Sequence, residues 1–282
     1  MLSLLIQKHN KKEGIKMTRE ERIMSNVLDH YAESLEHFEP SRVVGIFLQG
    51  SQNYGLDYEL SDVDTKLITT PTFEQIAFNK SPVSTTHIRY NDEHIDFKDI
   101  RLYMQTFRKQ NLNFLEILFT DFKIVNPLYE KEWNKLVENR ELIARYNLYQ
   151  AVKSMKGIAL EKYHAMEHAY PSKVDVLAQY GYDPKQLHHL LRVEEYLGRY
   201  ISGESYEDCL KPRRPEYLLG VKRGCYDLDT ARIIAKTAKE NVERVADNFT
   251  SKVENKGNPE VDLLLDEVQL SIMTKAIRLE IN

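Results

Sequence analysis

The spacing of apolar residues changes along the chain, from short strand-like runs in its first third to helical spacing afterwards. Residues 43–48 read VVGIFL, a short apolar and β-branched run that predicts a buried strand. Residues 87–97 predict two short strands joined by a polar Asn91-Asp92 turn. Residues 123–125 predict a further strand that ends at a proline. We therefore expect a small sheet in this part of the chain.

Helices are expected around these strands. Thr18, followed by Glu20 and Glu21, is typical of a helix N-terminus, and the apolar stripe behind it predicts a helix over residues 18–37. Residues 99–119 also have helical spacing, with an interruption expected near Asn111. The single tryptophan, Trp133, begins a further amphipathic segment and is expected in the core.

The second half of the chain is expected to be almost wholly helical. Residues 141–170 predict one long helix, and residues 185–197, 229–248 and 260–277 predict three more. These patterns indicate an α+β fold. We expect a flexible segment at residues 1–17, a small mixed sheet with flanking helices in residues 18–130, and a helical C-terminal domain in residues 131–282.

The composition is that of a globular protein of ordinary charge. The 282 residues are 42% apolar and 29% charged, which is sufficient for a core. The net charge of −4 excludes a general polycation, so any binding of nucleic acid must come from local patches. Cys209 and Cys225 lack metal-ligand spacing, which suggests a reducing cytoplasm. No apolar run approaches the roughly 20 residues that span a bilayer. Met17 is an alternative first residue of the protein.

The residues suited to chemistry follow the first expected strand. Gly50-Ser51 ends the apolar run, and Asp62-Val63-Asp64 follows about ten residues later. Residues i and i+2 of a strand point to one face, so Asp62 and Asp64 are expected to project side by side. Carboxylates that close repel one another unless a cation lies between them. Oxygen ligands of this kind suit magnesium together with substrate phosphates.

A third acid fits the same site. Asp96 lies between two apolar residues on an expected strand and points away from the face that they bury. If this strand lies beside Asp62 and Asp64, three carboxylates converge on one or two metal ions, as in two-metal phosphoryl transfer. The backbone around Gly50-Ser51 would then hold a triphosphate.

These motifs resemble the DNA polymerase β-like nucleotidyltransferase superfamily: Gly-Ser, a spacer, Asp-hydrophobic-Asp, and a later hydrophobic-Asp-hydrophobic. Within that superfamily, GSQNYGLDYELSDVDTK looks most like the predicted nucleotidyltransferases of bacteria and phages related to RNA-repair polymerases. Thr65 departs from the pattern, which more often has an apolar residue after the second acid. The resemblance implies a polymerase-β-like catalytic domain that binds an NTP, such as ATP, and two Mg²⁺ ions, with Mn²⁺ as the alternative. It implies a phosphate loop at Gly50 and Ser51 and metal ligands at Asp62, Asp64 and Asp96.

The resemblance also extends into the helical half. Such helices close over the nucleotide in the superfamily, so Lys153 and Lys156 are candidate triphosphate contacts by analogy. The Gly-Tyr-Asp-x-Lys…His…x-Arg pattern looks like the helical region of the RNA-repair relatives. It implies that Lys185, His189 and Arg192 face the active-site cleft. The alternative for each of these residues is an ordinary helix surface.

Other basic residues complete the candidate set. Lys66, on the same strand face as the two acids, is expected either to contact phosphate or to pair with a carboxylate. A basic loop with nearby tyrosines can track a nucleic-acid backbone, or it can be a charged connection. Its residues are Arg213, Arg214, Lys222 and Arg223.

The expected function is a metal-dependent nucleotidyltransferase that moves an NMP from an NTP to an acceptor hydroxyl and releases pyrophosphate. Asp96 is expected to complete the metal site and to serve as the general base. The resemblance and the basic loop favour an RNA or other nucleic-acid 3′ end as the acceptor, and hence a role in RNA repair. A protein or small-molecule acceptor remains open, and so does a non-catalytic nucleotide- or RNA-binding module.

Overall fold

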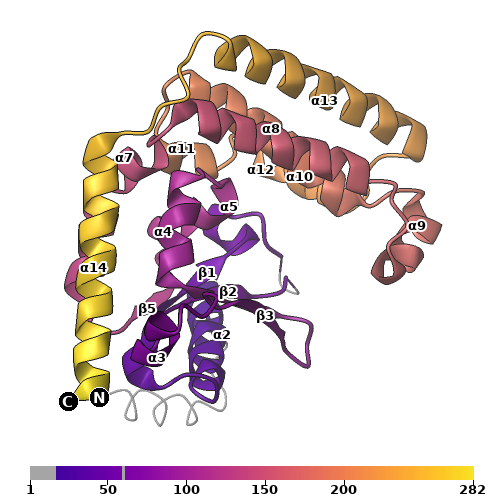
Figure 1. Cartoon of the computed structure of the whole chain (residues 1–282). Helices are drawn as coiled ribbons and strands as arrows, with labels where there is room; N and C mark the ends of the chain where they lie inside the picture. Colours follow the sequence, from indigo (N-terminus) through magenta and orange to yellow (C-terminus); the bar gives the residue numbers. More distant parts are fainter. Residues whose placement is uncertain (1–16, 59–60) are drawn as a thin grey trace.

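The computed structural model describes residues 17–58 and 61–282 of the chain. Within these residues, five strands form one mixed sheet, flanked and extended by helices (Figure 1). The strands are β1 (Val43–Gln49), β2 (Asp64–Thr69), β3 (Ser84–Ile88), β4 (His94–Asp99) and β5 (Lys123–Val125). The strands expected near residues 43–48, 87–97 and 123–125 are confirmed. The expectation for residues 1–16 lies outside the described part of the chain.

Helices cover the sheet and build the second half. The earlier ones are α2 (Arg19–Ser34), α3 (Phe73–Ala77), α4 (Ile100–Arg108), α5 (Leu112–Leu115) and α6 (Glu130–Glu138). The later ones are α7 (Arg140–Ala144), α8 (Leu148–Ala165), α9 (Val174–Tyr180), α10 (Pro184–Ile201), α11 (Tyr206–Leu210), α12 (Pro215–Lys222), α13 (Leu228–Thr250) and α14 (Pro259–Ile281). No described helix is long and apolar enough to cross a membrane.

The strand order brings three chain segments together at one end of the sheet. The order is β3-β4-β2-β1-β5; β2 and β4 run parallel, and the other neighbours run antiparallel. Gln49, at the end of β1, pairs with Asp64 at the start of β2. Lys66 of β2 pairs with Asp96 of β4. The end of β1 and the first halves of β2 and β4 therefore lie side by side.

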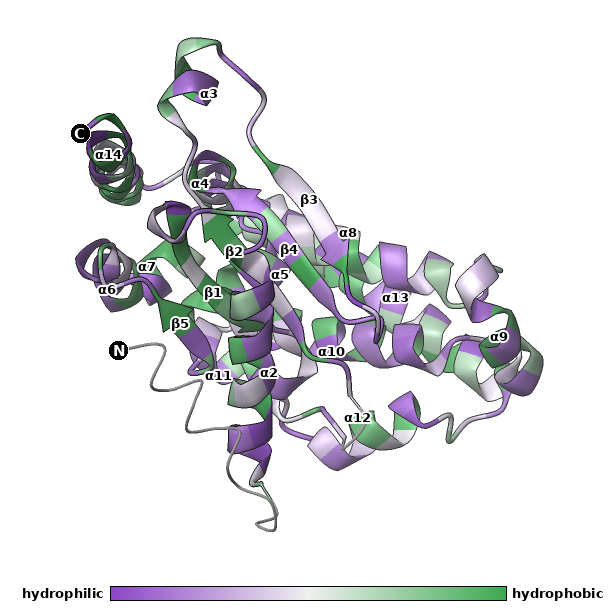
Figure 2. Ribbon diagram, turned by 90° about the horizontal axis from the view of Figure 1, so that it is seen from below, coloured by the Kyte–Doolittle hydropathy of each residue, from purple (hydrophilic) through white to green (hydrophobic). Residues whose placement is uncertain are grey.

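Hydrophobic cores lie on both faces of the sheet. Figure 2 shows α2 lying across the strands, with hydrophobic (green) stretches in β1 and β2. On one face, α2 packs Ile23 and Val27 against apolar residues of β1, β2 and β4. On the other face, a larger core begins at β1 and continues through α8, α10 and α13 to α14. Phe47 and Trp133 lie in this core, with 4.1 Å between their ring centroids, and both are fully buried. The expectation that Trp133 is a core residue is confirmed.

The last helix returns to the first part of the chain (Figure 1). Helix α14 packs against α4 and α6. Arg108 of α4 pairs with Asp262 and Asp266 of α14, each at 2.7 Å. Lys275 of α14 pairs with Glu132 of α6, also at 2.7 Å. The part expected to be a helical domain of residues 131–282 thus ends in a helix that packs on the part expected to be catalytic.

Two expectations about element bounds are wrong. The helix expected over residues 141–170 is divided into α7 and α8, because the Asn147 side chain accepts a hydrogen bond from the Gln150 N–H and caps a new helix. Asp62 does not lie in a strand, since β2 begins at Asp64. The Gln52 side chain donates a hydrogen bond to the Asp62 carbonyl, which holds this residue in the turn before β2.

Candidate functional site

One pocket gathers most of the polar residues that the sequence singles out. It has a volume of about 440 Å³ and lies where β1, β2 and β4 meet α8, α10 and α12. The expected site residues that line it are Gly50, Ser51, Asp62, Asp64, Lys66, Asp96, Lys185, His189, Arg192 and Lys222. Lining residues that sequence reasoning missed include Gln49, Tyr54, Phe114, Glu116 and Lys162.

Gly50 turns the chain sharply at the end of β1. Its φ of 97° and ψ of −157° lie in a region that glycine alone adopts readily. Its N–H donates a 2.8 Å hydrogen bond to Oε1 of Glu116, and its carbonyl accepts the Asn53 N–H at 3.0 Å. The Gly50 N–H is engaged in this way, and the Ser51 carbonyl accepts the Leu56 N–H, so the Ser51 hydroxyl is the side-chain group of this turn that is left to face a ligand.

Asp62 and Asp64 lie at the start of β2, close enough for the charge of one to act on the other. The Asp64 Oδ1 accepts a 2.9 Å hydrogen bond from the His94 N–H and lies 3.7 Å from the His94 Nδ1. Burial raises the pKa of Asp64; the contacts with His94 oppose this, and the charge of Asp62 adds to it, so the net pKa is raised. The two carboxylates therefore repel one another, which is the electrostatic setting that a bound cation relieves.

Asp96 lies on the same side of the sheet, between a hydroxyl and an ammonium group. Its Oδ1 accepts a 2.7 Å hydrogen bond from Thr86, and its Oδ2 lies 3.4 Å from the Nζ of Lys66. Lys66 is only 3% exposed and also donates to the Oε1 of Gln49. The sequence left open whether Lys66 meets a phosphate or a carboxylate, and in this structure it pairs with the carboxylate of Asp96.

The three acids do not converge on one point in this structure. Within residues 17–58 and 61–282, no three His, Cys, Asp or Glu side chains lie close enough to hold a metal ion. Asp62 and Asp64 share the pocket, and their mutual repulsion and oxygen donors fit a hard cation such as Mg²⁺. Asp96 is held by Thr86 and Lys66 and would have to leave the lysine to join them. The two-metal site stays a prediction.

The helices supply positive charge to the opposite wall of the pocket. Lys162 comes from α8, Lys185 and Arg192 from α10, and Lys222 from α12. Arg192 is 5% exposed, and its guanidinium lies 4.0 Å from the centre of the Tyr54 ring. Its Nε and Nη1 have no hydrogen-bond partner among the described residues. A buried arginine with free donors facing a pocket is suited to bind an anion.

The two adjacent histidines of α10 are uncharged at neutral pH. His188 is fully buried, its Nδ1 lies 2.8 Å from the Leu218 carbonyl oxygen, and burial lowers its pKa to about 4. Burial and the neighbouring cations also lower the pKa of His189, to well below its ordinary value. His189 therefore offers the pocket a neutral imidazole that can donate or accept a hydrogen bond.

Glu116 is a buried acid that sequence reasoning missed. It is 4% exposed, lines the pocket and anchors the Gly50 turn. Burial raises its pKa to about 6, although Lys66, Arg192 and the Gly50 N–H favour the charged form. In the sequence, Glu116 precedes Ile117 in an apolar helical run, and this pattern does not indicate a site residue. Only the fold brings its carboxylate to the Gly50 N–H.

Glu116→Gln is expected to raise the free energy of unfolding by up to about 2 kcal/mol near pH 8. The raised pKa of about 6 means that ionised Glu116 destabilises the folded state above that pH. The difference should vanish near pH 4, where the carboxyl is protonated in both states. Glutamine keeps an oxygen for the Gly50 N–H. Urea unfolding at the two pH values measures the effect.

Glu132→Gln is the matched control, since Glu132 is also a buried glutamate. Burial raises the pKa of Glu132, but hydrogen bonds from Lys275 and Ser271 outweigh it and lower the net pKa. This substitution should therefore destabilise the protein near pH 8. If Glu116→Gln also destabilised it there, the attraction of Lys66 and Arg192 would exceed the cost of burial, against our expectation.

Lys153 and Lys156 do not line the pocket. The residues of α8 that do are Ile158 and Lys162, which lie one turn apart on one face. Lys153 is exposed, and Lys156 pairs with Asp247 of α13 at 2.7 Å. At 100° per residue both lysines fall on the far side of the helix. The α8 lysine at the pocket is thus Lys162.

The basic loop also lies mostly away from the pocket. Arg213 pairs with Glu204 at 2.5 Å, and the guanidinium of Arg214 lies 4.9 Å from the Tyr217 ring centre. Arg223 is exposed. Lys222 alone of these four lines the pocket, where its Nζ donates a 3.0 Å hydrogen bond to the Leu56 carbonyl oxygen. Burial lowers the pKa of Lys222 to about 8.

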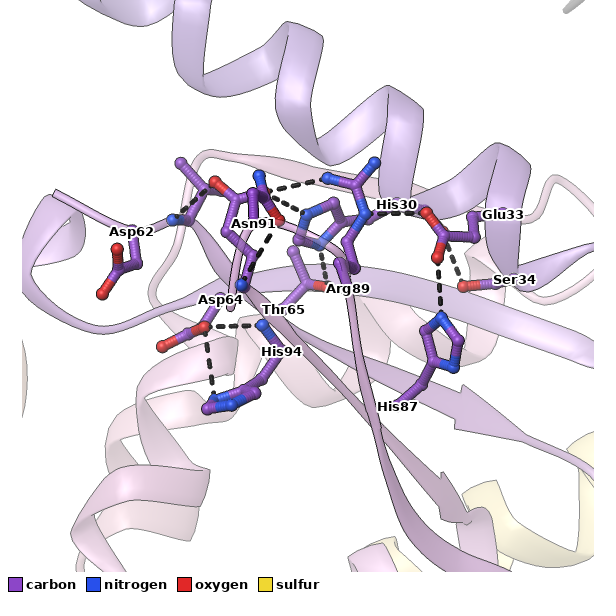
Figure 3. A network of polar contacts seen from close by, with 12 residues as sticks. His30, Glu33, Ser34, Asp62, Asp64, Thr65, His87, Arg89, Asn91 and His94 are labelled. Carbon is purple, nitrogen blue, oxygen red and sulfur yellow. Dashed lines mark hydrogen bonds and ion pairs between the residues drawn. The ribbon is translucent and has the colours of Figure 1, made fainter. Parts of the chain in front are cut away.

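A buried polar network supports the Asp62–Asp64 segment from behind (Figure 3). His30 of α2 is fully buried; its Nδ1 lies 2.8 Å from Oγ1 of Thr65 and its Nε2 lies 3.0 Å from Oε2 of Glu93. The other oxygen of Glu93 accepts the Val63 N–H at 3.1 Å. Val63 and Thr65 flank Asp64 in the chain. The network therefore holds the residues on both sides of this carboxylate, Val63 by its backbone N–H and Thr65 by its hydroxyl.

Glu93→Gln is expected to lower the free energy of unfolding by about 2 kcal/mol near pH 7. Burial raises the pKa of Glu93, but hydrogen bonds from His30, Asn91 and the Val63 N–H outweigh it and lower the pKa to about 2. A lowered pKa stabilises the fold above the unfolded value of 4.5, and this stabilisation is lost as the pH falls toward 2. Thermal unfolding across this range measures it.

Glu33→Gln is the control for this network. Glu33 accepts 2.7 Å hydrogen bonds from Arg89 and His87 but does not contact the Asp62–Thr65 segment. If the network positions Asp64, Glu93→Gln should reduce turnover at the pocket about tenfold, and Glu33→Gln should leave it unchanged. Equal losses in both variants would mean that the network acts only through general stability.

Comparison with known proteins adds little to this geometry. No family model matches the chain, and no curated protein matches it. One solved structure that resembles it is that of a nucleotidyltransferase-like protein from Exiguobacterium sibiricum 255-15. The resemblance covers 80% of this chain and 75% of that one, with 9% sequence identity and a TM-score of 0.29. A likeness at this level indicates nothing about the chemistry of the pocket, which rests on its own residues.

Proposed function

We propose that this pocket binds a nucleoside triphosphate with Mg²⁺ and transfers its nucleoside monophosphate to an acceptor hydroxyl. The observation that carries the proposal is the division of the pocket into two walls. Gly50-Ser51 and the three aspartates lie on the sheet side, and four cationic side chains lie on the helical side. A triphosphate between these walls would meet positive charge on one side and a metal-binding pair of acids on the other.

Each wall has a distinct role in this proposal. Asp62 and Asp64 would hold the cation, which supplies positive charge at the phosphates and at the attacking oxygen. Lys185, Arg192 and Lys222 neutralise the phosphates and orient them. The neutral ring of His189 adds a hydrogen bond. The Gly50 turn, fixed by Glu116, sets the position of the Ser51 hydroxyl.

The proposed reaction is an attack of the acceptor hydroxyl on the α-phosphate of the NTP. The acceptor oxygen forms a bond to the α-phosphorus, the bond from that phosphorus to the oxygen bridging to the β-phosphorus breaks, and pyrophosphate leaves. The hydroxyl proton passes to Asp96, which Thr86 and Lys66 hold in place. We infer that the acceptor is the 3′ hydroxyl of a nucleic acid, with a protein or a small molecule as the alternatives.

The Asp96–Lys66 pair supports a second candidate function. A carboxylate engaged by a buried lysine is not free to bind a metal ion, which would suit a module that binds a nucleotide without transferring it. This alternative predicts that an NTP binds in the pocket and is recovered unchanged.

Pyrophosphate release tests the proposal. Each of the four NTPs is incubated with the protein and Mg²⁺, with and without total RNA. Release that depends on RNA supports transfer to nucleic acid, and release without RNA points to a protein, a small molecule or water as acceptor. NTP binding without any release, under all these conditions, would favour the binding module.

A further inference from the structure

The sheet continues beyond the pocket as an open surface. β3 is at the edge of the sheet and pairs only with β4 among the described strands (Figure 2). Directly opposed residues of an antiparallel pair point to one face. The pairs Ser84–Lys98, Thr86–Asp96 and Ile88–His94 therefore share a face. We call it the β3–β4 ledge, and it comprises Ser84, Thr86, Ile88, His94, Asp96 and Lys98.

The ledge and the pocket share Asp96. Asp96 lines the pocket, yet its carboxylate accepts a hydrogen bond from Thr86, whose side chain is exposed on the ledge. Ser84 is exposed as well, and Ile88 is 62% exposed. A molecule lying on the ledge can thus reach the same carboxylate that faces the triphosphate side of the pocket.

Positive charge gathers at the end of the ledge where Ser84 pairs with Lys98. The Nζ atoms of Lys66 and Lys98 lie 4.3 and 4.5 Å from the centre of the Phe114 ring. Lys109, exposed at the end of α4, is close enough to act on Lys98. Burial lowers the pKa of Lys98, the charges of Lys66 and Lys109 lower it further, and the carboxylate of Asp96 opposes them without reversing the direction. Lys98 and Lys109 form no ion pair with any described carboxylate.

This charge is separate from the cations of the helical wall. Lys162, Lys185 and Lys222 line the pocket, whereas Lys98 and Lys109 do not. A triphosphate held by the helical wall would leave these two lysines with only the carboxylate of Asp96 nearby, which Lys66 already engages. The position of Lys98 beside Asp96 therefore suits a second anion, on the side from which an acceptor would approach.

We propose that the β3–β4 ledge, together with Lys109, binds the 3′ end of a single-stranded nucleic acid. Lys98 and Lys109 contact its backbone phosphates, and Ser84 and Thr86 offer hydroxyls to its sugar and phosphate oxygens. Tyr90, 94% exposed in the turn after β3, is available for stacking on a base. The presentation of the bound 3′ hydroxyl to Asp96 rests on the proposed function. The binding of the nucleic acid to the ledge does not.

The basic loop provides the matched comparison. Arg213 and Arg214 were the sequence-based candidates for nucleic-acid contact, but Arg213 pairs with Glu204 and Arg214 lies over Tyr217. Neither lines the pocket. The variants K98Q/K109Q and R213Q/R214Q each remove two positive charges, so they separate a local effect on the ledge from the loss of net charge.

The test is the binding of a short fluorescein-labelled single-stranded RNA to the full chain, followed by anisotropy over a range of potassium chloride concentrations. K98Q/K109Q should bind about tenfold more weakly, with the slope of log affinity against log salt reduced by about 1.4. R213Q/R214Q should bind as the unaltered protein does. K98R/K109R keeps both charges and should restore binding; thermal melting checks that all three variants fold.

Unchanged binding by K98Q/K109Q, or equal losses in K98Q/K109Q and R213Q/R214Q, would overturn the proposal. If the RNA does not bind and labelled NTP instead marks a protein, the ledge is not a nucleic-acid site. Pyrophosphate release from the unaltered protein is measured in parallel. RNA binding that depends on the two lysines, without pyrophosphate release, would support the nucleic-acid site on the ledge and contradict the proposed function. Pyrophosphate release without such binding would support the proposed function and contradict the site on the ledge.

Discussion

Asp62→Asn/Asp64→Asn is expected to lower NTP turnover by at least about a thousandfold, a loss of about 4 kcal/mol of transition-state stabilisation. The two carboxylates are the acids of the pocket free to hold a cation, because Asp96 is engaged by Lys66 and Thr86. The amide oxygens that replace them keep the shape of the site but not its charge. Pyrophosphate release with Mg²⁺ measures the loss.

This substitution should leave the fold intact. Burial raises the pKa of Asp64, so its ionised form costs stability at neutral pH, and asparagine removes that cost. An asparagine oxygen can still accept the His94 N–H. We expect the variant Asp64→Asn to melt at or above the temperature of the unaltered protein near pH 7. Loss of activity with unchanged or raised stability is the behaviour of a functional site rather than a structural one.

The control is Asp175→Asn/Asp229→Asn, which also removes two negative charges. Both aspartates are exposed, and neither lines the pocket. This variant should keep its turnover. If Asp62→Asn/Asp64→Asn turned over NTP as fast as this control, the carboxylates would take no part in the reaction and the proposed function would be wrong.

Gly50→Ala is expected to lower turnover at least about a hundredfold and to destabilise the protein by about 2 kcal/mol. The space around a Cβ at this position is ample, since the nearest atom would be 3.8 Å away. The strain comes from the backbone, whose φ of 97° with ψ of −157° is unfavourable for any L side chain. Relief of this strain would move the Gly50 N–H away from Glu116 and displace Ser51.

Gly55→Ala isolates the effect on the pocket. Gly55 ends the same short turn (η2, Ser51–Tyr54) at φ 69° and ψ 28°, with open space around it, and it does not line the pocket. Its substitution should cost about 1 kcal/mol of stability and leave turnover near normal. Turnover and urea unfolding of both variants decide between the two effects. Equal turnover in the two variants would show that the Gly50 turn has no special role.

The sheet side of the pocket can be predicted from the sequence, because its residues are placed by the ends of strands and by the pairing of neighbouring strands. Gly50 follows the last residue of β1, and Asp64, the first residue of β2, pairs with Gln49, so strand pairing alone brings this turn and this carboxylate together. Asp96 follows from its alternation with buried neighbours on β4. These relations are local or depend on a single pairing of strands.

The helical side is harder to predict, since it depends on how helices rotate against the sheet. Lys153, Lys156 and Lys162 are equally plausible in sequence, and only the packing of α8 selects Lys162. Glu116 reads as one polar residue in an apolar run, and its role appears only when β1 ends above it. The resemblance points to Arg192, but no spacing within α10 indicates that its guanidinium lies over the Tyr54 ring.

The return of α14 has a consequence for how the protein is made. Val261, Leu265 and Val268 of this helix complete the core on the side of α4 and α6. Translation proceeds at about 5–20 residues per second, so the stretch from α6 to α14 takes on the order of ten seconds to synthesise. During that interval the nascent chain carries apolar surface that its own sequence cannot yet cover. That surface is a natural binding site for chaperones on the ribosome-bound chain.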